Sequence, residues 1–317
     1  MGTHANMLRY LAQRLLQALG VVAAIAVVTF VMLNVVPGDP VRIMLGDRAT
    51  EEAVAQVRHQ MGLDRPLVVQ FASWVGGLLR GDLGTSYSQH RAVSELMTRA
   101  FGHTLRLAAG SFALAVVVGL AAGIVAAIFR GTWVDRLLMA CAVAGISAPA
   151  FWVAIMLQLA FALRLGWLPL SGVTRSHAFV LPTVALGVRY AASIARVARA
   201  SLLEVMGEDY LRTAIAKGLS RRAAILRHGL RNALVPIVTI AGTQLGDILA
   251  GSVVVESVFG IPGMGTMLVK AIGARDLPLI EGGVMYVALC CVAAYLLTDI
   301  LYALIDPRVR LGEGAGG

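Results

Sequence analysis

Residues Leu107–Phe129 read LAAGSFALAVVVGLAAGIVAAIF, which is 23 residues without a charged side chain. A helix needs about 20 mostly apolar residues to cross the hydrocarbon core of a membrane. A helix also suits lipid because it satisfies all of its backbone hydrogen bonds internally. The stretch therefore predicts a membrane-spanning helix.

Four more segments share this apolar character and predict four more spans. The first, Leu15–Val36, is 22 residues long and follows Arg9 and Arg14. The apolar core of a cleaved signal peptide is only about 7–15 residues long, so we expect this segment to be retained as the first span. The other three segments are Leu137–Leu163, which contains Pro149, Ala233–Val255 and Ile280–Ile305.

A sixth span is predicted over Ala178–Ala200, although Arg189, Arg196 and Arg199 interrupt its apolar pattern. Arg196 and Arg199 lie toward the cytoplasmic end, where long side chains can extend into water. Arg189 lies deeper, and a charge at that depth faces protein or water rather than lipid.

The overall composition agrees with a membrane protein. Hydrophobic residues make up 58% of the 317 residues and charged residues 14%, with a mean hydropathy of +0.78. Soluble domains are about 45–50% apolar and about 25% charged. These values exclude an ordinary water-soluble enzyme and a disordered chain, and they predict an all-α membrane protein with six transmembrane helices.

The formal net charge of +9 is unevenly distributed and predicts the orientation. The segment Arg189–Arg231 holds nine Lys and Arg against three acidic residues, whereas Pro37–Thr104 holds seven Arg and seven acidic residues. Cytoplasmic loops carry the excess of Lys and Arg. We therefore expect Arg189–Arg231 to face the cytoplasm, Pro37–Thr104 and Glu256–Leu279 to face outside, and both termini to be cytoplasmic.

The predicted spans divide the chain into three parts. Residues 1–36 form the N-terminal tail and first span, and residues 37–106 form an extracytoplasmic helical segment between spans one and two. Residues 107–317 form a five-helix core, in which the cytoplasmic loop 201–232 joins spans four and five.

The extracytoplasmic segment contains signals for short helices. Thr50 can cap a helix that ends at Gly62. Pro66 predicts the start of a second helix that is broken at Gly76-Gly77. A short third helix is expected from Val93 to Phe101.

The cytoplasmic loop carries the pattern most relevant to function, LLEVMGEDYLRTAIAKGLSRRAAILRHGLRNALVP over residues 202–236. Glu204–Lys217 predicts an amphipathic helix, and Gly218 is placed to end it. Ser220 can cap a second helix. The residues alone leave two interpretations open: a docking surface for another protein, or a solvated loop whose charges only fix the topology.

At these residues the sequence resembles a known family. The loop is similar to the EAA loop of binding-protein-dependent ABC importer permeases, with the general form E-A-A-x3-G. Arg212-Thr213-Ala214 followed by Gly218 departs from that form at its first two positions. The variant over 209–218, continued over 228–236, resembles the first permease subunit of the dipeptide/oligopeptide branch, and further matching segments extend from Pro37 to Arg308.

The resemblance implies a transport subunit, not an enzyme, in the inner (plasma) membrane of a bacterium. Such a permease pairs with a second homologous permease subunit, while an extracytoplasmic solute-binding protein delivers the substrate. Two cytoplasmic ATPase subunits bind ATP and Mg and dock on the loop; the chain itself binds no cofactor and no nucleic acid. The residues implied in ATPase coupling are Glu208, Asp209, Tyr210, Arg212, Thr213, Ala214, Lys217, Gly218 and Arg221.

Polar residues within the predicted spans are candidates for the translocation pathway. Asp247 and Asp299 lie inside apolar segments, where ionisable residues usually face a pathway or a protein partner. Gln244 lies three residues before Asp247. Pro149 is included as the residue that kinks the third span. Asp247 and Asp299 could instead form interhelical hydrogen bonds, or pair with Arg189.

Two other functions remain as alternatives. A proton-coupled secondary transporter would use Asp247 and Asp299, but it predicts an inverted repeat that the sequence does not show. A membrane-embedded hydrolase needs a paired nucleophile and base, and the Ser and His residues give no convincing pair. For a permease, we expect a short peptide as substrate; nickel chelates, glutathione and opines are alternatives in the same branch.

Overall fold

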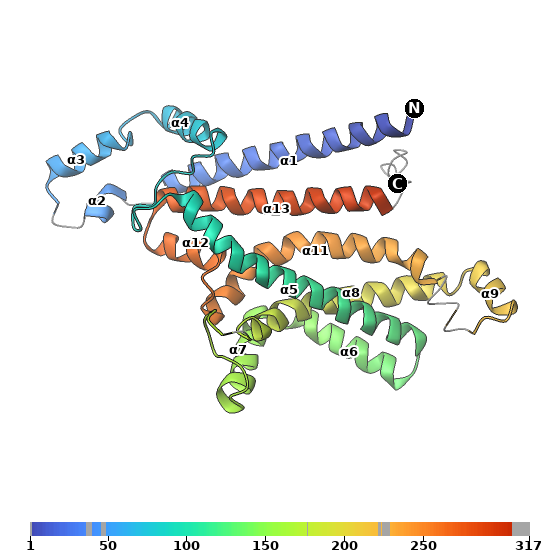
Figure 1. Cartoon of the computed structure of the whole chain (residues 1–317). Coiled ribbons are helices and arrows are strands. Elements are labelled where there is room, and N and C mark those ends of the chain that lie inside the picture. Colours follow the sequence, from blue (N-terminus) through green and yellow to red (C-terminus); the bar gives the residue numbers. More distant parts are fainter. Residues whose placement is uncertain are drawn as a thin grey trace.

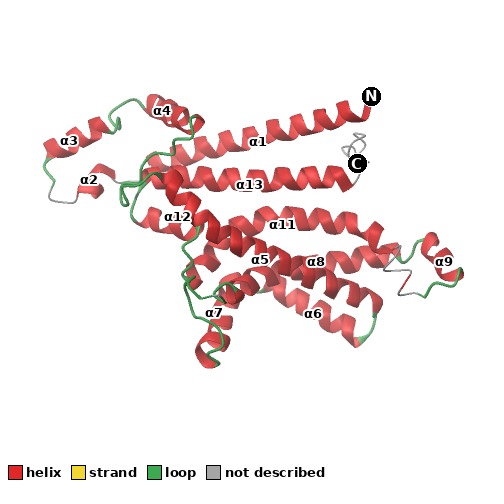
Figure 2. Ribbon diagram, in the orientation of Figure 1, coloured by secondary structure: helices red, strands yellow, loops and turns green. Residues whose placement is uncertain are grey.

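The computed structural model describes residues 2–35, 40–45, 49–175, 177–220, 223 and 229–305, and these residues form a bundle of helices (Figures 1 and 2). The one β-type pairing among them is an isolated bridge between Thr85 and Ala92. The all-α class predicted from the sequence is confirmed.

Five helices are long and apolar enough to cross a membrane. They are α1 (Gly2–Val35), α5 (Val93–Ile128), α8 (Val180–Val205), α11 (Leu230–Phe259) and α13 (Leu277–Ile305). The start of α1 and the end of α13 lie at the same end of the bundle (Figure 1). A bent helix pair brings the number of spans to six when it is counted as one.

This bent pair replaces the kinked helix expected over Leu137–Leu163. It consists of α6 (Trp133–Ser147) and α7 (Ala150–Leu157), and α7 continues as the π-helix η1 (Gln158–Arg164). The two halves are bent by 107°. Pro149 accounts for the break, because it lacks an N–H group and forces the residue before it into an extended conformation. Ala148 accordingly has ψ 127° and ends α6.

One close helix contact in the bundle depends on two glycines of α5. A Cβ at Gly119 would lie 2.5 Å from the carbonyl oxygen of Ala191, and one at Gly123 would lie 2.6 Å from the Cβ of Ala198. Only glycine permits this approach to α8, as expected of a small-residue motif between membrane helices. A second contact brings Gly242 of α11 against Thr298 of α13.

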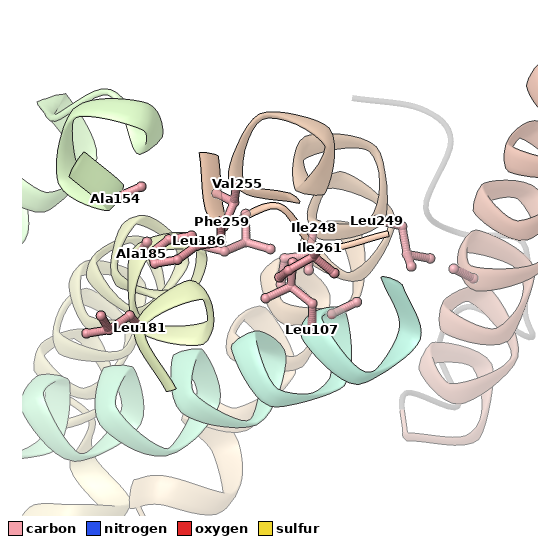
Figure 3. Close-up of a cluster of buried hydrophobic side chains, with 12 residues drawn as sticks. Leu107, Ala154, Leu181, Ala185, Leu186, Ile248, Leu249, Val255, Phe259 and Ile261 are labelled. Carbon is pink, nitrogen blue, oxygen red and sulfur yellow. The ribbon is translucent and has the colours of Figure 1, made fainter. Parts of the chain in front are cut away.

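A buried apolar cluster joins α5, α7, α8 and α11 (Figure 3). Leu107 of α5, Leu186 of α8 and Ile248 of α11 belong to it, and each is at most 3% exposed. Phe259 closes the cluster at the end of α11. The cluster fixes the position of α11 relative to α5 and α8.

Three short helices precede α5 at the end of the bundle opposite the start of α1 (Figure 1). They are α2 (Pro40–Leu45), α3 (Glu51–Gln60) and α4 (Leu67–Leu79). The Thr50 hydroxyl accepts a hydrogen bond from the N–H of Ala53 at 3.3 Å, so the predicted N-cap is confirmed. Gly62, where the helix was expected to stop, lies two residues after its last residue and has a left-handed conformation, with φ 66°.

Two predictions for this outer segment are wrong. The helix α4 continues through Gly76-Gly77 to Leu79, and it packs on α1 through Phe71 and Trp74, whose rings lie 5.2 and 6.0 Å from that of Phe30. The helix expected from Val93 to Phe101 is the first part of α5, which continues without a break to Ile128.

Candidate functional site

The candidate site is the loop after α8, which the charge distribution predicts to be cytoplasmic; here the structure places a separate short helix, α9 (Asp209–Ala216). The prediction of one helix from Glu204 to Lys217 is wrong, because α8 continues to Val205 and a turn separates it from α9. Within this turn the N–H of Gly207 donates to the carbonyl of Glu204 at 2.9 Å. The turn allows α9 to leave the axis of α8, and Figure 1 shows α9 projecting from this end of the bundle.

One apolar side chain anchors α9 to the membrane core. Leu211 is 1% exposed and belongs to a cluster that includes Leu202 of α8 and Ala233 and Ile237 of α11. Ala214, one turn further along, packs against the same cluster. The short helix α9 is therefore packed against the ends of two membrane helices.

The end of α9 is fixed by Gly218, as predicted. Gly218 has φ +97°, a conformation that side-chain-bearing residues rarely adopt. The N–H of Leu219 donates to the carbonyl of Ala214 at 3.3 Å, which is the long-range bond of a Schellman motif. This motif ends the helix abruptly and sets the direction of the chain that follows.

The rest of α9 presents polar groups to solvent. Asp209, Tyr210, Arg212 and Thr213 are exposed, and so is Lys217 just after the helix. Arg212 and Asp209 form an ion pair at 3.6 Å, but their side chains are 74% and 96% exposed. Such a solvated pair contributes little to stability. Its charges therefore remain available to a partner surface.

Two other predicted elements of the loop are only partly described. The Ser220 hydroxyl accepts a hydrogen bond from the N–H of Ala223 at 3.3 Å, which agrees with the expected cap. Arg221 and His228 lie outside the described residues. Glu208, also predicted for coupling, is exposed in the turn before α9.

An ion pair that the sequence did not reveal holds α8 close to this site. The Arg199 guanidinium donates to both carboxylate oxygens of Asp135, at 2.6 and 2.8 Å. The N–H of Gly131 donates to Asp135 at 2.9 Å. Asp135 is 4% exposed, so the pair joins α6 to α8 in a buried setting. Arg199 was expected near water at the helix end, and its side chain, which is 27% exposed, is also paired with Asp135.

The four pathway candidates do not form one cluster. Pro149 caps α7 at the break, and Gln244 is 5% exposed, with its Oε1 unpaired among the described residues. Asp247 is exposed and accepts a hydrogen bond from the Tyr295 hydroxyl at 3.1 Å. Asp299 forms an ion pair with Arg14 of α1 at 3.4 Å, rather than with Arg189.

A helical membrane bundle with a short separate helix between its fourth and fifth spans is the architecture expected of a permease of the ABC importer class. The chain belongs to the family described as binding-protein-dependent transport system inner membrane component, which matches residues 119–311. The N-terminal family of the same membrane component matches residues 7–108.

Among particular proteins, the chain is 44% identical over 304 residues to the glutathione transport system permease protein GsiC of Salmonella paratyphi A. This match covers 96% of the chain and 99% of that protein. The GsiC of Escherichia coli K12 is 42% identical over the same length.

Solved structures show the same fold. The inward-facing MetNI methionine ABC transporter matches with a TM-score of 0.55 at 19% identity, covering 67% of this chain and 96% of that one. An amino acid ABC transporter matches with a TM-score of 0.50 at 19% identity. The protein is therefore a multi-pass permease of a binding-protein-dependent ABC importer, and the secondary-transporter and hydrolase alternatives are set aside.

Proposed function

We propose that this permease imports short peptides and that glutathione is the first substrate to test. The observation that carries this proposal is the 44% identity, over nearly the full length of both chains, to a glutathione transport system permease. Glutathione is itself a small peptide-like molecule, so it falls within the substrate class expected from the sequence. Nickel chelates and opines are the competing substrates.

The proposed assembly contains a second homologous permease, two ATPase subunits that bind ATP and Mg, and an extracytoplasmic solute-binding protein. The proposed ATPase contact is α9 together with its flanking residues. Two features support it: Leu211 anchors the helix at 1% exposure, and the charges of Arg212 and Lys217 remain exposed. A helix that is anchored on one face and polar on the other can transmit the movement of a partner as a rigid body.

The proposed orientation places α9 and both termini in the cytoplasm of the bacterial cell. The beginning of α1 and the end of α13 lie at the same end of the bundle as α9 (Figure 1). The positive charge of Arg189–Arg231 supports a cytoplasmic location for that end.

The deciding experiment measures uptake by the complete importer. The importer is reconstituted in proteoliposomes, and its solute-binding protein is included in the assay. ATP-dependent accumulation of radiolabelled glutathione is expected, and unlabelled glutathione should compete more strongly than a nickel chelate or an opine. Accumulation of the nickel chelate alone would contradict the assignment of glutathione or another short peptide as the substrate. A chain that neither binds the ATPases nor accumulates any of these compounds would overturn the assembly.

A further inference from the structure

Two charged residues of opposite sign lie deep in the membrane bundle and are not explained by the coupling site. Asp247 lies 12 residues before Phe259, the last residue of α11, and Arg189 lies nine residues after Val180, the first of α8. At about 1.5 Å per residue these positions are about 18 and about 14 Å from the outer helix ends. Both side chains are exposed in the single chain. Charges at this depth mark a protein partner or a water-filled path.

One tyrosine hydroxyl contacts Asp247, and a second lies one turn away along α11. The Tyr295 hydroxyl donates to its Oδ1 at 3.1 Å. Gly246 makes this approach possible, because a Cβ there would lie 2.4 Å from the Tyr295 ring. The Tyr190 hydroxyl lies against Gly251, one turn further along α11 and 3.2 Å from the position of a Cβ. The carboxylate is thus bonded to a hydroxyl group of α13, and a hydroxyl group of α8 lies one turn further along α11.

Tyr190 also shows that the two charges lie on neighbouring helices. Arg189 directly precedes Tyr190 in α8, and the Tyr190 hydroxyl lies against Gly251 of α11, the helix that carries Asp247. Even so, within the described part of the chain neither residue forms an ion pair, with the other or with a third side chain. Asp299 provides the contrast, because Arg14 neutralises it at 3.4 Å. The charges of Asp247 and Arg189 therefore lie at similar depths on neighbouring helices but do not neutralise one another.

We propose that Arg189, Asp247 and the hydroxyls of Tyr190 and Tyr295 form a subsite for a zwitterionic substrate in the translocation pathway. The substrate ammonium group contacts Asp247, and its carboxylate contacts Arg189. This inference rests on the proposed function and narrows it: a peptide or glutathione carries both groups, whereas a fully anionic chelate offers nothing to Asp247. Charge-assisted hydrogen bonds of this kind are roughly twice as strong as neutral ones.

The test uses the complete importer in lipid nanodiscs, without the solute-binding protein, so that only membrane-embedded binding is measured. The probes are radiolabelled glutathione and N-acetylglutathione, which lacks the ammonium group. Asp247→Asn should weaken glutathione binding about tenfold or more, the loss expected for a charge-assisted contact of about 1.5–3 kcal/mol. It should leave N-acetylglutathione binding unchanged. Asp247→Glu should retain most of the affinity, and Arg189→Gln should weaken both probes.

The matched control is Asp64→Asn, which removes the same charge from the outer segment and should change neither affinity. Equal losses for both probes in Asp247→Asn, or no loss for either, would overturn the subsite. Recovery of an Asp247→Lys complex by an acidic residue in the second permease would also overturn it, by showing that Asp247 pairs with a protein side chain. Uptake by the wild-type importer distinguishes failure of the subsite from failure of the proposed function. If the proposed function is wrong, the wild-type importer accumulates neither glutathione nor a dipeptide.

Discussion

The end of the bundle that contains α12 (Met264–Gly273) and the end that contains α9 are held together in different ways. In the proposed orientation these are the outer end and the cytoplasmic end. At the outer end, the carboxylate of Glu256 is fully buried and accepts hydrogen bonds from Thr104 at 2.6 Å and Ser252 at 3.1 Å. It also accepts from the N–H groups of Gly265 and Thr266, at 2.9 and 3.2 Å. These two N–H groups belong to the first turn of α12. A side chain of α11 therefore caps α12, where a negative charge is favourable.

A second buried carboxylate fixes the outer loop between α4 and α5. Asp276 is 1% exposed and accepts hydrogen bonds from the hydroxyls of Ser86 and Ser88, at 2.5 and 2.7 Å. The N–H groups of Tyr87 and Ser88 donate to it at 3.1 and 3.0 Å. The loop is thereby attached to the start of α13.

The cytoplasmic end has no comparable network around α9 among the described residues. Its attachment depends on Leu211 and on the ends of α8 and α11, and its polar groups face solvent. The difference teaches that the outer end is built to keep one geometry, since breaking it leaves several buried donors unpaired. The helix α9 has a buried anchor in Leu211, and its polar side chains are exposed, as the proposed contact with a partner requires.

The largest expected effect is at Glu256. Glu256→Ala leaves the donors of Thr104, Gly265 and Thr266 buried without an acceptor, and we expect it to lower the free energy of unfolding by about 3–5 kcal/mol. Glu52→Ala, at an exposed position in α3, should cost less than about 1 kcal/mol. The measurement is thermal unfolding of the purified complex in detergent. Similar midpoints for the two variants would show that the outer network does not stabilise the fold.

The next effect tests the anchor of the cytoplasmic end. Leu211→Ala removes a side chain that is 1% exposed, and a buried Leu→Ala change costs about 2–5 kcal/mol. Because α9 projects from the bundle, we expect this loss to appear as local release of α9, with hydrogen exchange increased over residues 209–216 and transport uncoupled from ATP hydrolysis. Leu79→Ala is the matched control, because Leu79 is 85% exposed in α4. Equal exchange in both variants would contradict the role of the anchor.

A smaller effect is expected at the end of α9. A Cβ at Gly218 meets no atom within 4 Å, so the cost of Gly218→Ala comes from the backbone conformation alone. This cost is about 1–2 kcal/mol, because an L-residue is disfavoured at positive φ. We expect weaker ATPase association, measured by co-purification with the importer subunits.

Gly76→Ala is the control for this change, since Gly76 lies within α4 and its Cβ also meets nothing within 4 Å. An alanine in a helix interior is favoured over glycine by about 1 kcal/mol. If both variants associate with the ATPase subunits as the wild type does, Gly218 is not needed for the proposed ATPase contact.

The sequence predicted the parts of this fold that depend on local patterns. Apolar length identified five spans, and Thr50 and Gly218 carry local signals for helix ends. The long α5 was divided in the prediction because its first part contains Glu95, Arg99 and Arg106, which do not resemble a membrane span. Its continuity depends on packing against α12 and α13.

Long-range pairs could not be predicted in the same way. Asp135 and Arg199 are 64 residues apart, and Asp276 and Ser86 are 190 residues apart. Each of these residues has an ordinary interpretation in its local sequence, as a helix-start acid, a boundary arginine or a loop residue. Only the fold brings each pair within hydrogen-bonding distance.

The smallest expected effect at neutral pH concerns the attachment of the outer loop by Asp276. Burial raises the pKa of this carboxyl, but the hydrogen bonds from Ser86, Ser88 and Tyr87 outweigh it, so the pKa lies below its ordinary value of 3.8. A carboxyl with a lowered pKa in the folded state stabilises that state above the unfolded pKa and loses this contribution as the pH falls through the folded pKa. The attachment should therefore be constant from pH 8 to about 5 and weaken only below about pH 4. Hydrogen exchange at the amides of Tyr87 and Ser88, corrected for its intrinsic pH dependence, measures this directly. Asp276→Asn should reduce the protection of these amides at every pH and abolish its acid dependence. Loss of protection already between pH 7 and 5 in the wild type would show that Asp276 does not hold the loop as a carboxylate.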